Sequence, residues 1–299
     1  MTQKLTPSTA LLLIVPPVLW AGNAVVGRLV VDMVPPITLN FLRWAIAFVI
    51  LLPMGYTVLL KGSGLWRDRR RFAILGLLGI GLYNALQYLA LHSSTPINVT
   101  LVGASMPMWM MLTGVLFFES KVSGKQIAGA VLSLTGVLVV LSHGHWQQLL
   151  GLRFVIGDLF MVVATIVWSF YSWSLVQTRD TDAVRRNWAT FLLAQVSFGV
   201  VWSGIFAAGE WAVTDSQIHW GWPLISALAF VAVGPAVIAF RCWGAGVQRA
   251  GPTTAGFFNN LTPLFAAVLS SAFLGETPHA YHAAAFGFIV TGIILSSRR

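Results

Sequence analysis

The feature that most constrains the fold is a succession of apolar runs, each about as long as a bilayer is thick. A helix needs about 20 apolar residues to cross the hydrocarbon core, and only short polar breaks separate these runs. We predict ten helices, over residues 9–31, 37–60, 72–92, 97–118, 125–142, 154–176, 189–211, 221–247, 253–274 and 280–296. Only 9% of the residues are charged, whereas soluble domains have about a quarter. The predicted fold class is therefore an all-α polytopic membrane protein.

The chain also repeats itself at a fixed offset of 156 positions. The features Pro96, Pro107 and Thr135-Gly136 of the first half return as Pro252, Pro263 and Thr291-Gly292. Internal repeats built from apolar helices are typical of transporters whose substrate site lies where the repeats meet. We therefore divide one transmembrane domain into a first five-helix repeat, residues 1–147, and a second, residues 148–299.

Basic residues are distributed unevenly over the segments that connect the predicted helices. With a cytoplasmic N-terminus, the inner segments hold 14 of them: Lys4, Lys61, Arg67, Arg69, Arg70, Arg71, Lys121, Lys125, Arg179, Arg185, Arg186, Arg249, Arg298 and Arg299. The outer segments hold only Arg153. By the positive-inside rule, this bias predicts two cytoplasmic termini and an even number of spans. Because five spans per repeat is an odd number, the second repeat is expected to be inverted relative to the first.

Other classes of function find little support in the sequence. The net charge of +9 is spread over several inner loops, so we expect no nucleic-acid partner. The chain has one cysteine, Cys242, and the loop pair His143 and His145 lacks a nearby carboxylate, so we expect no metal and no cofactor. An intramembrane enzyme would need a convergent catalytic set, and no HExxH or GxSxG pattern occurs.

Each half resembles the repeat of the drug/metabolite transporter superfamily, the EamA-type module. The resemblance rests on a proline after a short helix link, a proline within the fourth helix, a glutamate at its end and a glycine-rich fifth helix. These are Pro96, Pro107, Glu119 and Thr135-Gly136-Val137 in the first half, and Pro252, Pro263, Glu276 and Thr291-Gly292-Ile293 in the second. Trp20 to Asn23 fit the family's opening helix, and Trp168 stands 148 positions after Trp20. In overall sequence the chain is most similar to the bacterial aromatic amino-acid exporters.

The resemblance implies a transporter of the bacterial inner membrane with a central cavity between helices one, three, four, six, eight and nine. Polar side chains deep in a membrane are costly unless they face a partner or water, and mid-depth aromatic rings can stack on an aromatic substrate. The candidate substrate-binding residues are Trp20, Asn23, Tyr83, Gln87, Trp109, Trp168, Tyr171, Asn259 and Asn260. The alternatives are hydrogen bonds between helices for the amides, and core or lipid packing for the aromatic residues.

Prolines and arginines within the predicted helices complete the candidate pathway. The candidate gating residues are Pro16, Pro17, Pro107, Pro235 and Pro263, because a proline inside a helix removes a backbone donor and permits bending. Arg241 is a charged candidate for the pathway, whereas Arg43 is interpreted as snorkelling to a membrane interface. These residues suggest alternating access around a midplane cavity.

The acidic residues bear on the energy source. None lies near the middle of a predicted helix, and Asp158 is one turn inside the sixth. Proton-coupled transporters commonly carry a mid-membrane carboxylate, so we predict facilitated export of aromatic and other neutral amino acids by a monomer in the lipid bilayer. Glu119 and Glu276 are then structural residues at helix ends. The alternative is a proton-coupled exporter of cationic drugs or other small metabolites, for which Asp158 is the one candidate carboxylate.

Overall fold

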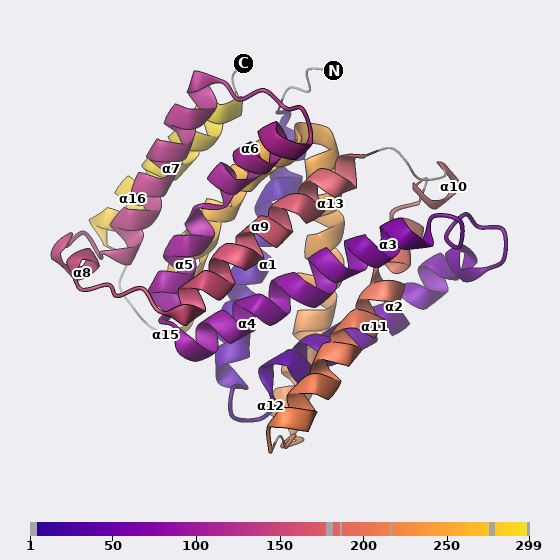
Figure 1. The fold of residues 1–299 in the computed structure, drawn as a ribbon. Coiled ribbons are helices and arrows are strands. Elements are labelled where there is room, and N and C mark those ends of the chain that lie inside the picture. Colours follow the sequence, from indigo (N-terminus) through magenta and orange to yellow (C-terminus); the bar gives the residue numbers. More distant parts are fainter. Residues whose placement is uncertain (1–4, 178–181, 186, 216, 275–278, 298–299) are drawn as a thin grey trace.

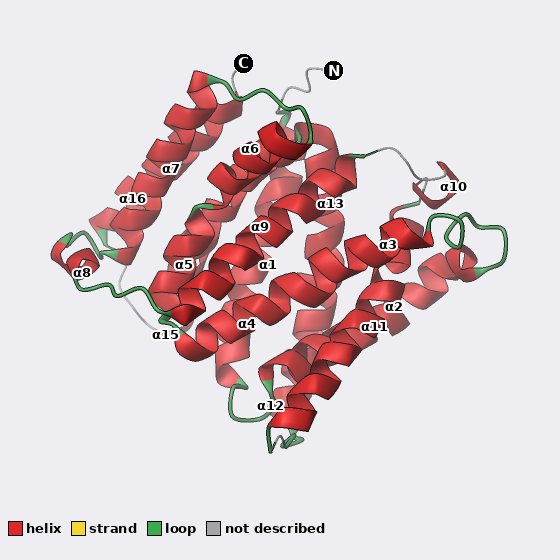
Figure 2. Cartoon of the chain, in the orientation of Figure 1, coloured by secondary structure: helices red, strands yellow, loops and turns green. Residues whose placement is uncertain are grey.

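The computed structural model describes residues 5–177, 182–185, 187–215, 217–274 and 279–297 (Figure 1). Every regular element in these ranges is a helix, as the fold class predicts (Figure 2). The first half holds α1 Pro7–Leu29, α2 Pro36–Gly55, η1 Tyr56–Leu59, α3 Arg69–Gly76, η2 Leu77–Leu82, α4 Tyr83–Ser93, α5 Pro96–Ala104, α6 Met106–Phe117 and α7 Gly124–Leu141. The second half holds α8 Gln147–Leu150, α9 Ile156–Val176, α10 Asp182–Arg185, α11 Trp188–Val213, α12 Trp222–Val231, η3 Ala232–Ile238, α13 Ala239–Ala250, α14 Pro252–Phe258, η4 Asn259–Leu261, α15 Thr262–Leu274 and α16 Ala280–Ser297.

Eight helical stretches within the described ranges are long and apolar enough to cross a bilayer. They are Pro7–Gly27, Pro36–Leu59, Arg69–Leu91, Gly124–Leu141, Ile156–Val176, Trp188–Val213, Trp222–Ala250 and Ala280–Ser297. A ninth results if the bent pair Asn98–Ala104 and Met106–Phe117 counts as one span. The predicted helix over residues 253–274 is divided among α14, η4 and α15. The chain is thus a polytopic helical membrane protein, and the full count of ten spans stays a prediction.

Both divided segments are interrupted just before a repeated proline. The helix axis bends by 41° between α5 and α6, where Pro107 is the second residue of α6. In the second half the 3-10 turn η4 interrupts the helix, and Pro263 is the second residue of α15. A proline lacks the N–H that would bond the carbonyl four residues earlier. The repeated prolines therefore stand next to breaks at matching positions of the two halves.

A second irregularity also occurs in both halves. η2 and η3 are π-helices in the middle of membrane segments, and π-helical turns are frequent at functional sites. Pro235 lies inside η3 and removes one backbone donor there. In η2, a side chain at Gly79 would clash with the ring of Tyr171. The helices that follow begin with Tyr83 in α4 and with Ala239 and Phe240 in α13.

Several contacts between a helix of the first half and a helix of the second have a counterpart in which the two halves exchange roles. α4 packs on α9, and α13 packs on α1. In the same way α6 packs on α9 and α15 on α1, while η2 packs on α11 and η3 on α2. α7 lies along α16, and α2 lies along α11, so each of these pairs joins corresponding helices (Figure 1).

The contact between α7 and α16 depends on the glycines of the repeated Thr-Gly pairs. A methyl group at Gly136 would lie 2.8 Å from a backbone oxygen of α16, and one at Gly292 would lie 2.6 Å from the carbonyl oxygen of Gly129. Only glycine permits this close approach of the two backbones. The neighbours of Gly136 include Ala285 and Ile289, and the neighbours of Gly292 include Gly129 and Ser133. Gly129 stands 156 positions before Ala285, and Ser133 stands 156 positions before Ile289. The two glycines therefore meet corresponding partners.

Charged side chains form hydrogen bonds with helix termini at both ends of the bundle. At the start of α2, the Glu210 carboxylate accepts bonds from the Thr38 N–H and hydroxyl, both at 2.7 Å. At the end of α9, Arg71 donates to the carbonyl oxygens of Ser174 and Gln177 at 3.0 and 2.6 Å. A carboxylate at a helix N-terminus and a guanidinium at a C-terminus each interact favourably with the helix dipole.

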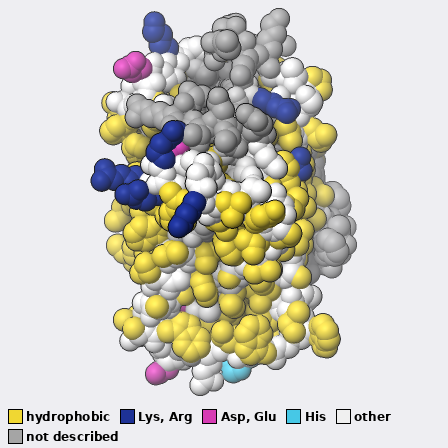
Figure 3. Space-filling model, turned by 90° about the vertical axis from the view of Figure 1, so that its right-hand side faces the viewer, with side chains coloured by type: hydrophobic (Ala, Val, Ile, Leu, Met, Phe, Trp, Pro, Cys, Tyr) yellow, Lys and Arg dark blue, Asp and Glu magenta, His cyan; other side chains and the backbone are white. Residues whose placement is uncertain are grey.

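Apolar side chains form the lateral surface, and basic side chains gather toward one end. Figure 3 shows hydrophobic atoms over the middle and lower part of one face, with Lys and Arg in its upper half. The beginning of α1 and the end of α16 lie at the same end of the bundle (Figure 1). Lys4, Arg179, Arg186, Glu276, Arg298 and Arg299, on which parts of the sequence argument rest, lie outside the described residues.

We predict that Gly129→Ala weakens the packing of α7 on α16. The new methyl group would lie 2.7 Å from the Gly292 carbonyl oxygen, so the backbones must separate, at a cost of about 1–3 kcal/mol. The matched control is Gly287→Ala on α16, where nothing lies within 4 Å of the added methyl. Thermal unfolding of the purified protein in detergent should show a lower midpoint for the first variant only, and equal midpoints would contradict the packing argument.

Candidate functional site

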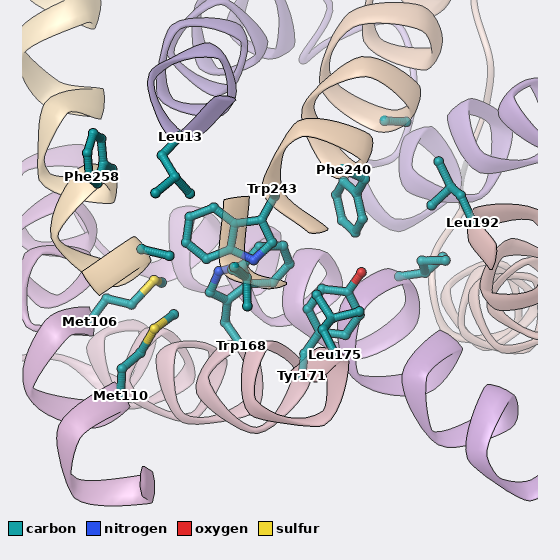
Figure 4. Packing of buried hydrophobic residues seen from close by; sticks show 14 of the residues in the cluster. Leu13, Met106, Met110, Trp168, Tyr171, Leu175, Leu192, Phe240, Trp243 and Phe258 are labelled. Atoms are coloured by element: carbon teal, nitrogen blue, oxygen red, sulfur yellow. The ribbon is translucent and has the colours of Figure 1, made fainter. Parts of the chain in front are cut away.

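Six aromatic side chains meet in the interior of the bundle, and we call them the aromatic cluster. Its members are Trp20, Tyr83, Trp168, Tyr171, Phe240 and Trp243. Trp168 is the centre, because its ring lies 4.6, 5.0, 5.4, 5.5 and 5.5 Å from the rings of Tyr83, Tyr171, Trp20, Phe240 and Trp243. Figure 4 shows Trp168, Tyr171, Phe240 and Trp243 pointing toward one another from two helices.

Two helices from each half contribute side chains to the aromatic cluster. α1 and α4 of the first half contribute Trp20 and Tyr83, and α9 and α13 of the second contribute the other four. Trp168 with Tyr171, and Phe240 with Trp243, are spaced by three residues, so each pair shares one face of its helix. Trp20 and Trp168 touch edge to face at 5.4 Å. This contact joins α1 of the first half to α9 of the second.

The cluster is closed in this conformation. Trp168 and Trp243 are 0% exposed and Tyr171 is 1% exposed, so these rings fill the space where the sequence predicts a wet cavity. Two of them have polar partners: the Tyr171 hydroxyl donates to Gln195 at 2.9 Å, and the Trp243 ring N–H donates to Ser172 at 3.2 Å. The ring N–H of Trp168 is buried without a partner.

Arg43 lies inside the bundle, so its interpretation as a snorkelling residue is wrong. It is the eighth residue of α2, roughly 10 Å along the helix at 1.5 Å per residue, and only 2% of it is exposed. The guanidinium donates to the Asn23 side-chain oxygen at 3.4 Å and lies 5.4 Å from the Trp44 ring. Tyr83 of the aromatic cluster is one of its electrostatic neighbours.

Three predicted site residues have their polar contacts elsewhere. Trp109 donates to Ser105 of the preceding turn at 3.1 Å. Asn259 donates to the sulfur of Met106, and Asn260 donates to Ser133 at 2.8 Å. The side-chain oxygens of both asparagines are buried without a partner. The contacts of the two asparagines join η4 to α6 and α7, as expected for hydrogen bonds between helices. Gln87, a turn after Tyr83, is half-buried.

The remaining predicted residues are divided between bends and the surface. Pro16 and Pro17 lie inside α1, and Pro235 lies inside η3. Pro107 and Pro263 follow the two helix breaks described above. Arg241 is exposed and lies 4.3 Å from the Trp188 ring. Its charge is therefore held at the surface of the helices rather than among the cluster residues.

A cavity of about 960 Å³ opens at the end of the bundle where the basic loops lie. It is lined by Arg67, Asp68, Arg69, Arg70, Arg71, Ile74, Leu75, Phe117, Phe118, Glu119, Ser174 and Gln177. These residues come from α3 and the loop before it, from the end of α6 and the turn after it, and from the end of α9 and the residue after it. Glu119 has a backbone φ of 52° and is exposed in the turn after α6, which agrees with its expected place at a helix end.

The opposite end is fastened by Asp158, the third residue of α9. The carboxylate is 2% exposed and accepts hydrogen bonds from the Ser94 hydroxyl, from Asn98 at 2.9 Å and from the Val155 N–H at 2.8 Å. Ser94 and Asn98 flank the link between α4 and α5. Asp158 thus joins three helices. No group of three His, Cys, Asp or Glu that could hold a metal occurs among the residues whose positions are described.

Sequence reasoning missed three residues that belong to this centre. Trp243 stands 156 positions after Gln87, so the repeat offset applied to a predicted residue would have found it. Phe240 has no polar atom to draw attention and is found only by its contacts with Trp20, Trp44 and Trp168. Arg43 is interpreted from the sequence as reaching a membrane interface, whereas the structure buries it inside the bundle.

Comparisons with known proteins show that the chain is similar to transporters over most of its length. The model of the EamA-like transporter family matches residues 7–142 and again residues 155–298. The chain is 24% identical to the uncharacterized transporter YyaM of Bacillus subtilis, over 84% of this chain and 80% of that protein. It is also 24% identical to the aromatic amino acid exporter YddG of Ancylobacter novellus, over 88% of both. Its identity to a probable amino-acid metabolite efflux pump of Salmonella typhimurium is 24%, over 93% and 91%.

A solved crystal structure has the same fold. It superimposes with a TM-score of 0.74 at 22% identity and covers 96% of each chain. The relatives named above are transporters, none is named as an enzyme, and the family model accounts for nearly the whole chain in two matches. The chain belongs to the EamA-like transporter family.

Proposed function

We propose that this transporter exports aromatic and other neutral amino acids across the bacterial inner membrane. The observation that carries the proposal is the aromatic cluster, in which rings from both halves surround Trp168. Aromatic faces at the centre of a membrane protein provide stacking surfaces for an aromatic side chain. Two relatives with this chain's length are named as an aromatic amino acid exporter and a probable amino-acid metabolite efflux pump. The polar groups are proposed to come from Asn23, three residues after Trp20, and from Gln87, four residues after Tyr83.

The proposed topology is ten spans in two inverted repeats, residues 1–147 and 148–299, with both termini in the cytoplasm. Three observations support it: the exchanged helix contacts, the corresponding neighbours of Gly136 and Gly292, and the two separate matches of the family model. The basic residues around the cavity support a cytoplasmic location for that end.

The proposed mechanism is alternating access by a monomer. Asp158 fastens the outer end through Ser94 and Asn98, while the cavity lies at the inner end. Opening toward the outside then requires the Asp158 contacts to break and the rings around Trp168 to separate. The π-helices and the breaks before Pro107 and Pro263 are the places where the helices have fewest regular backbone bonds, so bending is assigned to them.

Labelling of single cysteines tests the topology. In a Cys242→Ala background, a membrane-impermeant maleimide added to intact cells should label Asp215→Cys in a predicted outer loop. Lys61→Cys, exposed in a predicted inner loop, should be labelled only after the cells are permeabilised. The reverse pattern would overturn the proposed orientation.

Replacing Trp168 tests the site. We predict that Trp168→Leu raises the KM for tryptophan about tenfold, because one ring contact of about 1 kcal/mol or more is lost, whereas Trp168→Phe retains most of the activity. Counterflow of labelled tryptophan in proteoliposomes measures the change. Trp220→Leu, at an exposed position before α12, is the matched control; equal KM values for the Trp168 and Trp220 variants would refute the site.

The energy source is proposed to be the substrate gradient alone. Asp158 is the buried carboxylate found in the described part of the spans, and three donors hold it at a helix end rather than near the cluster. We predict that phenylalanine flux in proteoliposomes is unchanged when a pH gradient is added. A flux that requires the gradient and is lost in Asp158→Asn would favour the alternative, proton-coupled export of cationic compounds.

A further inference from the structure

We infer that Arg43 is the residue that binds the carboxylate of the substrate, so that the transporter accepts aromatic acids and zwitterions and rejects aromatic amines. This inference rests on the proposed function and names the substrate class that the same centre takes. It begins from a guanidinium that is buried in a membrane-spanning helix and is 2% exposed.

The charge of Arg43 lacks a counter-ion among the described residues. The ion pair found there joins Arg67 and Asp68 at the exposed end. The Arg43 guanidinium contacts the side-chain oxygen of Asn23 and lies 5.4 Å from the Trp44 ring. A buried charge without a partner is strongly unfavourable in a membrane. A chain that keeps an arginine there has a use for an anion, and the substrate can provide it.

The polar atoms around Arg43 are also incompletely paired. The guanidinium makes one hydrogen bond, to Asn23 at 3.4 Å, and its Nε is buried without a partner. The side-chain oxygen of Asn40 and the ring N–H of Trp44, its neighbours along α2, are likewise buried without partners. Unpaired buried polar groups mark a place where a ligand can complete the hydrogen bonds. An arginine offers two parallel N–H groups to a carboxylate.

The position of Arg43 matches a substrate whose ring lies on the aromatic cluster. The guanidinium lies 5.4 Å from the Trp44 ring, and the Trp44 ring lies 4.7 Å from the Phe240 ring of the cluster. Asn23, which contacts Arg43, stands one turn after Trp20 of the cluster on α1. We therefore place the ring of a substrate whose carboxylate binds Arg43 on the side of the cluster formed by Trp20 and Phe240. An aromatic amine would bring a second positive charge to the same place.

Thermal unfolding of the purified protein with single-function probes tests the inference without transport. Phenylacetate carries the ring and the carboxylate, phenethylamine carries the ring and the ammonium, and acetate carries the carboxylate alone. We expect phenylacetate to raise the unfolding midpoint of the wild type and the other two probes to leave it unchanged. Equal shifts with phenethylamine would overturn the inference, and equal shifts with acetate would overturn the link between Arg43 and the aromatic cluster.

Variants of Arg43 locate the effect. Arg43→Gln should abolish the shift with phenylacetate and raise the KM for phenylalanine roughly 10- to 100-fold, the cost of one lost charged hydrogen bond. Arg43→Lys keeps the charge without the planar fork and should lose less affinity. The Arg43→Lys variant still tests the inference if Arg43→Gln does not fold. Arg249→Gln, which removes a charge from the exposed end of α13, is the control and should behave as the wild type.

The outcomes separate this inference from the proposed function. If the wild type moves phenylalanine and Arg43→Gln moves it with an unchanged KM, the function stands and the role of Arg43 falls. The wild type could transport neither phenylalanine nor tryptophan, while phenylacetate raises the unfolding midpoint of the wild type but not of Arg43→Gln. In that case the proposal of amino-acid export is refuted and the carboxylate site stands. A purely structural role would lower the unfolding midpoint of both variants while preserving the preference for phenylacetate over phenethylamine.

Discussion

The hydrocarbon core of a bilayer offers no water, so every polar group placed there must find a partner in the protein or in a ligand. Ordinary helices meet this requirement by themselves, and most of this chain consists of them. The exceptions are informative: the bend before Pro107, the turn η4, the two π-helices and the buried Arg43. All of them lie inside a bundle in which the helices of one half cover those of the other.

The sequence predicts the helical architecture well because its signals are local. Long apolar runs give the helix positions within a few residues, and the family resemblance is confirmed by a model that matches both halves. The breaks within residues 97–118 and 253–274 were not anticipated as such, although Pro107 and Pro263 are the residues beside them. A proline within an apolar run indicates that bending is tolerated, but its direction and size depend on the packing of neighbouring helices.

The site was predicted less completely, since its members come together only in three dimensions. Trp20, Tyr83, Trp168 and Tyr171 were found because polar or large aromatic residues are rare at mid-depth. The burial of Arg43 was not found, because a sequence shows neither which face of α2 points into the bundle nor that Asn23 of α1 lies within reach of it. The centre is also asymmetric: Trp243 stands 156 positions after Gln87, and the first half supplies two rings of the cluster while the second supplies four. A scaffold with corresponding halves thus carries side chains that differ where the substrate is proposed to bind.

The contact between α7 and α16 has a consequence for how such a chain can arise. Gly136 meets residues that correspond to the neighbours of Gly292, so the same patch lies on both sides of the seam. A surface of this kind is self-complementary, as in a two-fold dimer of identical subunits. Two unlinked copies of a single five-helix ancestor would already fit together there, before any gene fusion. Once joined in one chain, the two halves could change their interior side chains separately.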